Sequence, residues 1–135
     1  MEVIHERYSK NAGAVFSLKA HLVWCPKYRR PVLVDAVADR LRGLIAEKAA
    51  ELEMTVLTLE IMPDHVHLFI EFDPTRSIAE IANRFKGYTS RVLRQEFASL
   101  RSRLPALWSR SYYAGTVGYV NDATARKYIE AQKGK

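Results

Sequence analysis

The segment TVLTLEIMPDHVHLFIEF, residues 55–72, restricts the fold more than any other part of the sequence. Two runs rich in β-branched and aromatic residues, 55–61 and 65–72, are separated by the short sequence Met-Pro-Asp. Proline and aspartate favour a tight turn, and the flanking runs are typical of strands, so the segment predicts a β-hairpin. The fold must therefore contain this antiparallel pair of strands.

The second strand of the hairpin carries two histidines, His65 and His67, which are one residue apart. Because side chains alternate between the faces of a strand, both imidazoles point to one face. The apolar residues Val66, Leu68 and Ile70 point to the other. Two neighbouring imidazoles can hold a metal ion, or they can be polar residues at the edge of a sheet. The pair alone leaves both interpretations open.

A helix is predicted on each side of the hairpin. The first begins near Asp35, a candidate N-cap, and its apolar residues recur at helical spacing: Val37, Leu41, Leu44, Ile45 and Leu52. The second is opened by Ser77 and Glu80, which form an S-x-x-E capping box. Its buried stripe is expected to comprise Ile78, Ile81, Ala82, Phe85, Val92 and Phe97.

A strand is predicted towards each end of the chain. In residues 14–25, polar residues such as His21 alternate with apolar ones, and residues 111–120 are rich in aromatic and β-branched side chains. Asn121 or Asp122 would cap a short final helix. This order predicts an α+β, ferredoxin-like (RRM-like) fold: an antiparallel sheet of four or five strands with helices on one face and a short C-terminal helix. One domain is expected to span residues 1–135.

The composition narrows the class of protein. The chain has 135 residues, of which 48% are hydrophobic, so it can build a globular core. Its one cysteine, Cys25, excludes an internal disulfide framework and a multi-cysteine zinc site, and is expected to be a buried thiol. No apolar run approaches the roughly 18 residues of a membrane span, and the N-terminus lacks the pattern of a signal peptide. A cytoplasmic protein without a membrane partner is therefore expected.

Basic residues outnumber acidic ones by 21 to 15, which gives a net charge of +6. This excess suits a polyanionic partner such as nucleic acid, although each basic group alone is more typical of a solvated surface. The candidate phosphate contacts are Lys27, Arg29, Arg30, Arg84, Lys86, Arg91, Arg94 and Arg110. Trp108, Tyr112 and Tyr113 either stack on unpaired bases or belong to the core.

The final helix contains Tyr128 and Gln132, which are four residues apart and so share a face. In one interpretation the tyrosine packs on the sheet and the glutamine is solvated. In the other, Gln132 joins the histidine pair as a third metal ligand and the tyrosine hydroxyl lies near the metal. A phenolate is a good leaving group, so its attack on phosphate can be reversed. Because its pKa is normally about 10, a tyrosine nucleophile needs help to lose its proton.

Taken together, HVH after MPD and Y-x-x-x-Q on the last helix resemble the single-tyrosine HUH transposases. These enzymes move small insertion sequences as single-stranded DNA. The segments HLVWCPKYRRPVL and LWSRSYYAGTVG also resemble the family, and the likeness covers nearly the whole chain. It implies that His65, His67 and Gln132 bind Mg²⁺ or Mn²⁺, although the donor set by itself would suit Mn²⁺ or Zn²⁺. It also implies that Tyr128 attacks the scissile phosphate to give a 5′-phosphotyrosine and a free 3′-hydroxyl.

The resemblance further implies a homodimer with a joined sheet, in which the tyrosine helix of one subunit can complete the site of the other. The substrate would be single-stranded DNA with subterminal hairpins at the ends of the element. Two alternatives remain. A related HUH nuclease, such as a replication initiator or a domesticated enzyme that acts on repetitive palindromes, would have nearly the same site. A non-catalytic module that binds single-stranded nucleic acid would have structural histidines.

Overall fold

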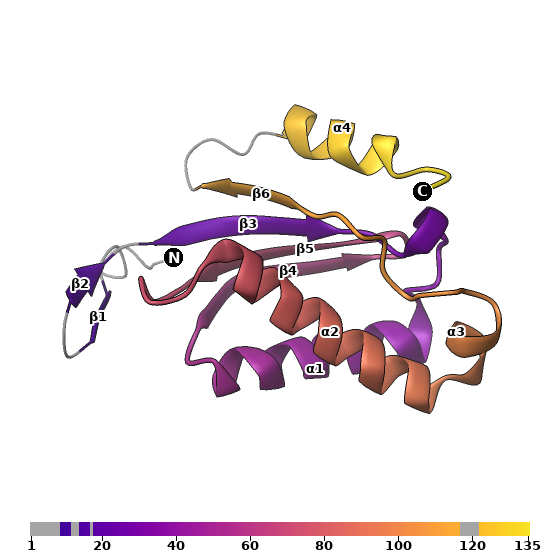
Figure 1. The fold of residues 1–135 in the computed structure, drawn as a ribbon, viewed down its shortest axis with the longest axis horizontal. Coiled ribbons are helices and arrows are strands. Elements are labelled where there is room, and N and C mark those ends of the chain that lie inside the picture. The colour runs from indigo at the N-terminus through magenta and orange to yellow at the C-terminus, as the bar shows by residue number, and fades with distance from the viewer. Residues whose placement is uncertain (1–8, 12–13, 17, 117–121) are drawn as a thin grey trace.

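A computed structural model of the chain describes residues 9–11, 14–16, 18–116 and 122–135. Its main sheet has four antiparallel strands in the order β4-β5-β3-β6 (Figure 1). Their bounds are β3 Lys19–Trp24, β4 Thr55–Met62, β5 His65–Glu71 and β6 Tyr113–Thr116. Helix α1 (Asp35–Glu51) connects β3 to β4, and helix α2 (Ile78–Glu96) follows β5. The predicted ferredoxin-like fold is confirmed.

Two layers of helix cover the sheet unequally. Helices α1 and α2 lie together against one face, and helix α4 (Asp122–Ala131) lies along the other, beside β3 and β6 (Figure 1). The core fills the space under α1 and α2, where the strands present apolar side chains to the helices. Its fully buried members include Leu22, Trp24, Leu41, Leu44, Ile45, Leu68, Ile70, Ile81, Phe85 and Leu93.

The predicted hairpin is confirmed. Strands β4 and β5 pair in antiparallel register up to Met62 and His65, so the turn comprises Pro63 and Asp64. The pairing shifts between Val56 and Thr58, at a β-bulge or irregularity. Because the register is set beside the turn, it also decides which β5 side chains face the helices and which face α4.

Of the three predicted helix caps, the one at Ser77 is confirmed. The Ser77 hydroxyl accepts a hydrogen bond from the Glu80 backbone N–H at 3.1 Å, as the capping box predicts. The predicted Asp35 cap is wrong, because Val34 occupies the N-cap position with extended backbone and makes no side-chain cap bond. Asp35 is instead the first helical residue and has a φ of 50°, in the left-handed region.

The first predicted strand is divided in the structure. Strand β2 (Ala14–Phe16) pairs with β1 (Ser9–Asn11) in a separate two-stranded sheet, and β3 begins only at Lys19. Three short elements were not predicted: strand β1, the 3₁₀ turn η2 (Lys27–Arg29) and helix α3 (Ala98–Ser102). The end of the last predicted strand, residues 117–120, and the candidate cap Asn121 lie outside the described residues. Within the described part of the chain, no helix is long and apolar enough to span a membrane.

Candidate active site

The two histidines lie on the predicted face of β5. Val66, Leu68 and Ile70 are fully buried towards α1 and α2. His65 and His67 alternate with them and therefore face the side of the sheet on which α4 lies. The side chains of the pair are 20% and 26% exposed, so both reach solvent from a partly covered position.

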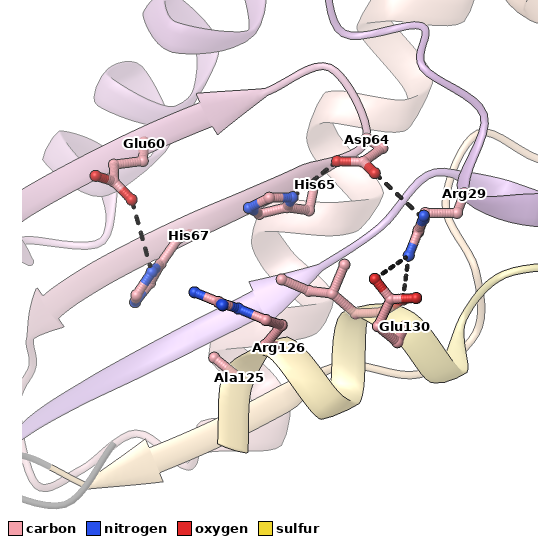
Figure 2. A pocket seen from close by; sticks show the side chains of 9 residues that line it. Arg29, Glu60, Asp64, His65, His67, Ala125, Arg126 and Glu130 are labelled. Carbon is pink, nitrogen blue, oxygen red and sulfur yellow. Dashed lines mark hydrogen bonds and ion pairs between the residues drawn. The ribbon is translucent and has the colours of Figure 1, made fainter. Parts of the chain in front are cut away.

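A pocket of about 520 Å³ lies in front of the histidine pair, between the sheet and α4 (Figure 2). Sheet residues and helix residues both line it: Arg29, Glu60, Asp64, His65, His67, Ala125, Arg126, Ile129 and Glu130. Arg126 extends from α4 towards His67 in Figure 2. The pocket thus combines imidazole, carboxylate and guanidinium groups, which suits the binding of a cation, a phosphate or both.

The orientation of His65 is set by the turn residue before it. His65 Nδ1 lies 2.9 Å from Asp64 Oδ1. A carboxylate oxygen accepts and does not donate, so Nδ1 carries the proton and the lone pair of the neutral ring is on Nε2. Asp64 is held in turn by Arg29, whose Nε lies 3.2 Å from Asp64 Oδ2.

His67 contacts residues of both neighbouring strands. Its Nε2 lies 2.8 Å from Nδ1 of His21 on β3, and its Nδ1 lies 3.9 Å from Glu60 Oε1 on β4. The His21 ring also stacks on Phe69, with ring centres 4.2 Å apart. Burial lowers the pKa of His21, and the neighbouring His67 lowers it further.

Tyr128 lies on α4 and Gln132 lies in the turn that directly follows it, and neither lines the pocket. Tyr128 Oη is 2.9 Å from Ser111 Oγ, and the serine hydroxyl donates to Gln132 Oε1 at 3.2 Å. Gln132 is only 6% exposed, so the interpretation of it as a solvated residue is wrong. Within one chain, His65 and His67 line the pocket, whereas Tyr128 and Gln132 lie outside it and are joined through Ser111.

The surroundings of Tyr128 favour its neutral form. Burial raises the pKa of the Tyr128 phenol, and the hydrogen bond between Tyr128 and Ser111 opposes this only in part. Nearby Cys25 is fully buried, as predicted, and burial raises the pKa of its thiol to about 12. In this position of α4, therefore, the tyrosine keeps its proton at neutral pH.

The donor set of the pocket fits a divalent cation only in part. His65 and His67 can supply two imidazole ligands, with carboxylates of Asp64 and Glu60 nearby. Among the described residues, no group of three His, Cys, Asp or Glu side chains is arranged to hold a metal ion. A divalent cation at this place would therefore need a third ligand from another residue type or from a different position of α4.

The candidate DNA contacts separate into three groups. Arg29 belongs to the pocket. Two other basic residues hold backbone carbonyls: Lys86 Nζ donates to Ser109 and Ser111 at 2.8 and 3.1 Å, and Arg94 donates to the carbonyls at 104 and 105. The rest, Lys27, Arg30, Arg84, Arg91 and Arg110, are exposed or half-buried on the surface. Their contact with DNA stays a prediction.

Of the three aromatic candidates, one belongs to the core. Trp108 is 6% exposed, packs edge-on against Trp24 and donates its indole N–H to Thr89 Oγ1 at 3.0 Å. The core interpretation of Trp108 is therefore confirmed. Tyr112 and Tyr113 are half-buried, and the Tyr113 ring centre lies 6.2 Å from that of Tyr128.

Several residues of the site were not assigned a role from the sequence. They are His21, Glu60, Asp64, Ser111 and Arg126. His21 could have been found from the alternation of polar and apolar residues in β3. Antiparallel pairing of β3 with β5 places His21 on the same face of the sheet as His67. No comparable pattern distinguished Ser111 or Arg126, because their positions depend on how α4 packs.

Comparisons with known proteins show the family to which the chain belongs. The family described as "Transposase IS200 like" matches residues 14–132. The ISDra2 transposase TnpA of Deinococcus radiodurans is 39% identical over 128 residues, which cover 93% of this chain and 91% of the relative. The transposase for insertion sequence element IS200 of Salmonella typhimurium is 33% identical over 120 residues, covering 87% of this chain and 78% of the relative.

Two solved structures are also similar. The crystal structure of a putative transposase from Deinococcus radiodurans superposes with a TM-score of 0.87 at 35% identity, covering 94% of this chain and 99% of that one. A REP-associated tyrosine transposase bound to a REP hairpin has a TM-score of 0.57 at 11% identity, covering 90% of this chain and 68% of that one, and shares the fold. With its family match spanning nearly the whole sequence, the chain belongs to the IS200-like transposases, the single-tyrosine (Y1) HUH family.

Proposed function

We propose that this transposase cuts and rejoins single-stranded DNA through a covalent bond to Tyr128, at a site where His65 and His67 hold Mg²⁺ or Mn²⁺. The observation that carries the proposal is the pocket. The two imidazoles line it opposite α4, the helix that carries Tyr128 and is directly followed by Gln132. Membership of the IS200-like family supports transposition as the overall process.

In the proposed reaction, Tyr128 Oη attacks the scissile phosphorus. A phosphorus–oxygen bond to the tyrosine forms, and the bond from phosphorus to the 3′ oxygen breaks. The phenol gives up its proton and the departing 3′ oxygen acquires one, which leaves a 5′-phosphotyrosine and a free 3′-hydroxyl. A bound cation would offset charge that develops on the phosphoryl oxygens. Attack by a 3′-hydroxyl of another strand reverses the step and rejoins DNA.

The observed position of α4 supports a resting arrangement in this proposal. Ser111 holds Tyr128 and Gln132, and burial keeps the phenol protonated. For catalysis, α4 has to move within its own chain or enter the site of a second copy. We favour a homodimer in which α4 of one subunit serves its partner. Gln132 would travel with Tyr128, since it directly follows α4 and both side chains contact Ser111.

The proposed substrate is single-stranded DNA with a hairpin near each end of the insertion sequence. The related tyrosine transposase that was solved on a REP hairpin supports this class of substrate. The surface residues Arg30, Arg84, Arg91 and Arg110 are available for its phosphates. Among pocket residues, Arg126 and Arg29 carry the charge that would attract the scissile phosphate.

The test is a denaturing gel of the protein with labelled single-stranded hairpin oligonucleotides from its own genomic flanks. Wild-type protein should give a slower, covalent protein–DNA band with Mg²⁺ or Mn²⁺ and none with EDTA. Tyr128→Phe should lose the band completely yet still bind the hairpin, because only the nucleophilic oxygen is removed.

Tyr113→Phe is the matched control, since this tyrosine lies beside Tyr128 and should leave the band intact. Hairpin binding without any adduct, with verified flanks and either metal, would contradict the proposal. That result would favour a binding module instead.

A further inference from the structure

A third histidine lies beside the pair. His21 on β3 is opposite Phe69 in the strand register and diagonal to His67. Its Nδ1 lies 2.8 Å from His67 Nε2, and its ring is stacked within 9° of parallel on the Phe69 ring. The stacking and the hydrogen bond together define the orientation of the His21 ring, so a rotation would break at least one of them.

His65 and His67 each have one ring nitrogen in a hydrogen bond with a neighbouring side chain. His65 has Nδ1 bonded to Asp64, and His67 has Nε2 bonded to His21, so each member of the pair has one ring nitrogen held by a neighbour. A neutral imidazole binds a metal through the nitrogen that carries no proton. Metal-binding histidines almost always donate the other ring N–H to a nearby acceptor, which fixes the tautomer and the ring orientation.

We infer that His21 is a positioning residue of the proposed metal site, acting on His67 as Asp64 acts on His65. His21 Nδ1 accepts the N–H of His67 Nε2, which leaves the His67 lone pair on Nδ1. That nitrogen is on the side of Glu60, within the pocket that His65 also lines. This inference rests on the proposed function, because it assumes that the pair binds a cation.

Three substitutions separate the hydrogen bond from the stacking. His21→Asn keeps a polar acceptor at the place of Nδ1 but loses the ring. His21→Phe keeps a ring that can stack on Phe69 but cannot accept the hydrogen bond. His21→Gln stays polar, but its amide lies one methylene farther from the backbone. It therefore serves as a second variant that lacks the hydrogen bond to His67, if the phenylalanine variant does not fold.

The first readout is Mn²⁺ affinity, measured by calorimetry on the whole protein without DNA. We expect a 10–100-fold weaker affinity for the Phe and Gln variants, the usual effect of losing an outer hydrogen-bond partner of a metal ligand, and a change of at most about threefold for Asn. The second readout is the ¹⁵N spectrum of the His67 ring in metal-free protein. Wild type and the Asn variant should show the proton on Nε2, whereas Phe and Gln should show a mixture of tautomers.

Opposite results would overturn the inference in recognisable ways. If the Phe variant binds Mn²⁺ as wild type does, or if Asn is as weak as Phe, the hydrogen bond does not position the ligand. If the loss equals that of His67→Ala, His21 is itself a ligand rather than a positioning residue. If wild-type protein binds no Mn²⁺ at all, the proposed metal site fails and the inference fails with it, whatever the spectrum of His67 shows.

Discussion

The two faces of the central sheet are covered in different ways, although the same strands supply both. Towards α1 and α2, residues such as Leu22, Leu68 and Ile70 are fully buried and make apolar contacts. Towards α4, His21, His65 and His67 are only partly buried and make polar contacts. Because alternate residues of a strand point to opposite faces, one strand can stabilise the fold on one side and offer reactive groups on the other.

The contacts that hold the helices in place also differ between the two faces. Helices α1 and α2 bury an apolar stripe that cannot leave the sheet without exposing the core. Helix α4 is also held by polar contacts that water can replace: hydrogen bonds with Arg29 and Ser111, and an ion pair between Arg29 and Glu130. Elements with few buried apolar contacts open at a lower free energy than the whole domain. This suits a helix that carries the proposed nucleophile.

The largest effect on stability is expected from Leu68→Ala, on the face towards α1 and α2. Removing this fully buried side chain should lower the free energy of unfolding by about 2–5 kcal/mol in urea denaturation. The neighbouring His67→Ala should cost only about 1 kcal/mol, the usual net value of a lost hydrogen bond, while abolishing the covalent DNA band. Equal losses of stability in Leu68→Ala and His67→Ala would mean that the two faces of the sheet contribute equally to folding, which would contradict the described difference.

Opening of α4 can be followed separately through Cys25. This thiol is fully buried on the face towards α4, near Tyr128, and is the one cysteine of the chain. Its labelling by a thiol reagent in native buffer therefore reports the exposure of that face. Urea denaturation of the same variants measures global unfolding.

A smaller effect is expected from Arg29→Met. Arg29 donates to the carbonyl of Ile129 at 3.2 Å and forms ion pairs with Glu130 and Asp64. Hydrogen bonds to charged groups contribute about 1.5–3 kcal/mol each, and solvent screening reduces this for the exposed Glu130. Cys25 labelling should accelerate by at least about tenfold, since each factor of ten corresponds to about 1.4 kcal/mol.

Arg30→Met is the control for this change, because Arg30 is the exposed neighbour in the same loop. It should label at the wild-type rate. An unchanged rate in Arg29→Met would show that apolar packing, rather than Arg29, holds α4 in place.

The smallest effect is expected from Ser111→Ala. It removes a neutral hydrogen bond to Tyr128 and leaves the buried Gln132 without its serine donor, which should cost about 1 kcal/mol. Cys25 labelling should therefore rise about fivefold, with little change in urea denaturation. Ser99→Ala on the surface of α3 is the control. A larger effect of Ser111→Ala than of Arg29→Met would reverse the proposed order of the two contacts.

The sequence by itself determined the β-hairpin and the two faces of its second strand. Alternation in residues 65–72 required Val66, Leu68 and Ile70 to lie opposite His65 and His67, and the Pro63-Asp64 turn set the hairpin register. The capping box at Ser77 located the start of α2. These features were predictable because they depend on residues that are adjacent or one turn apart, where the geometry of strands, turns and helices leaves few choices.

Only the tertiary structure decided how the two halves of the site lie relative to each other. The spacing of Tyr128 and Gln132 placed them on one face of a helix, but not which face would meet the histidine pair. Packing of α4 turned that face to Ser111 and presented Ala125, Arg126 and Ile129 to the pocket instead. The contact of His21 with His67 likewise required β3 and β5 to pair in one register. Such contacts join residues far apart in the chain, so local periodicity carries no information about them, and the packing of whole elements determines them.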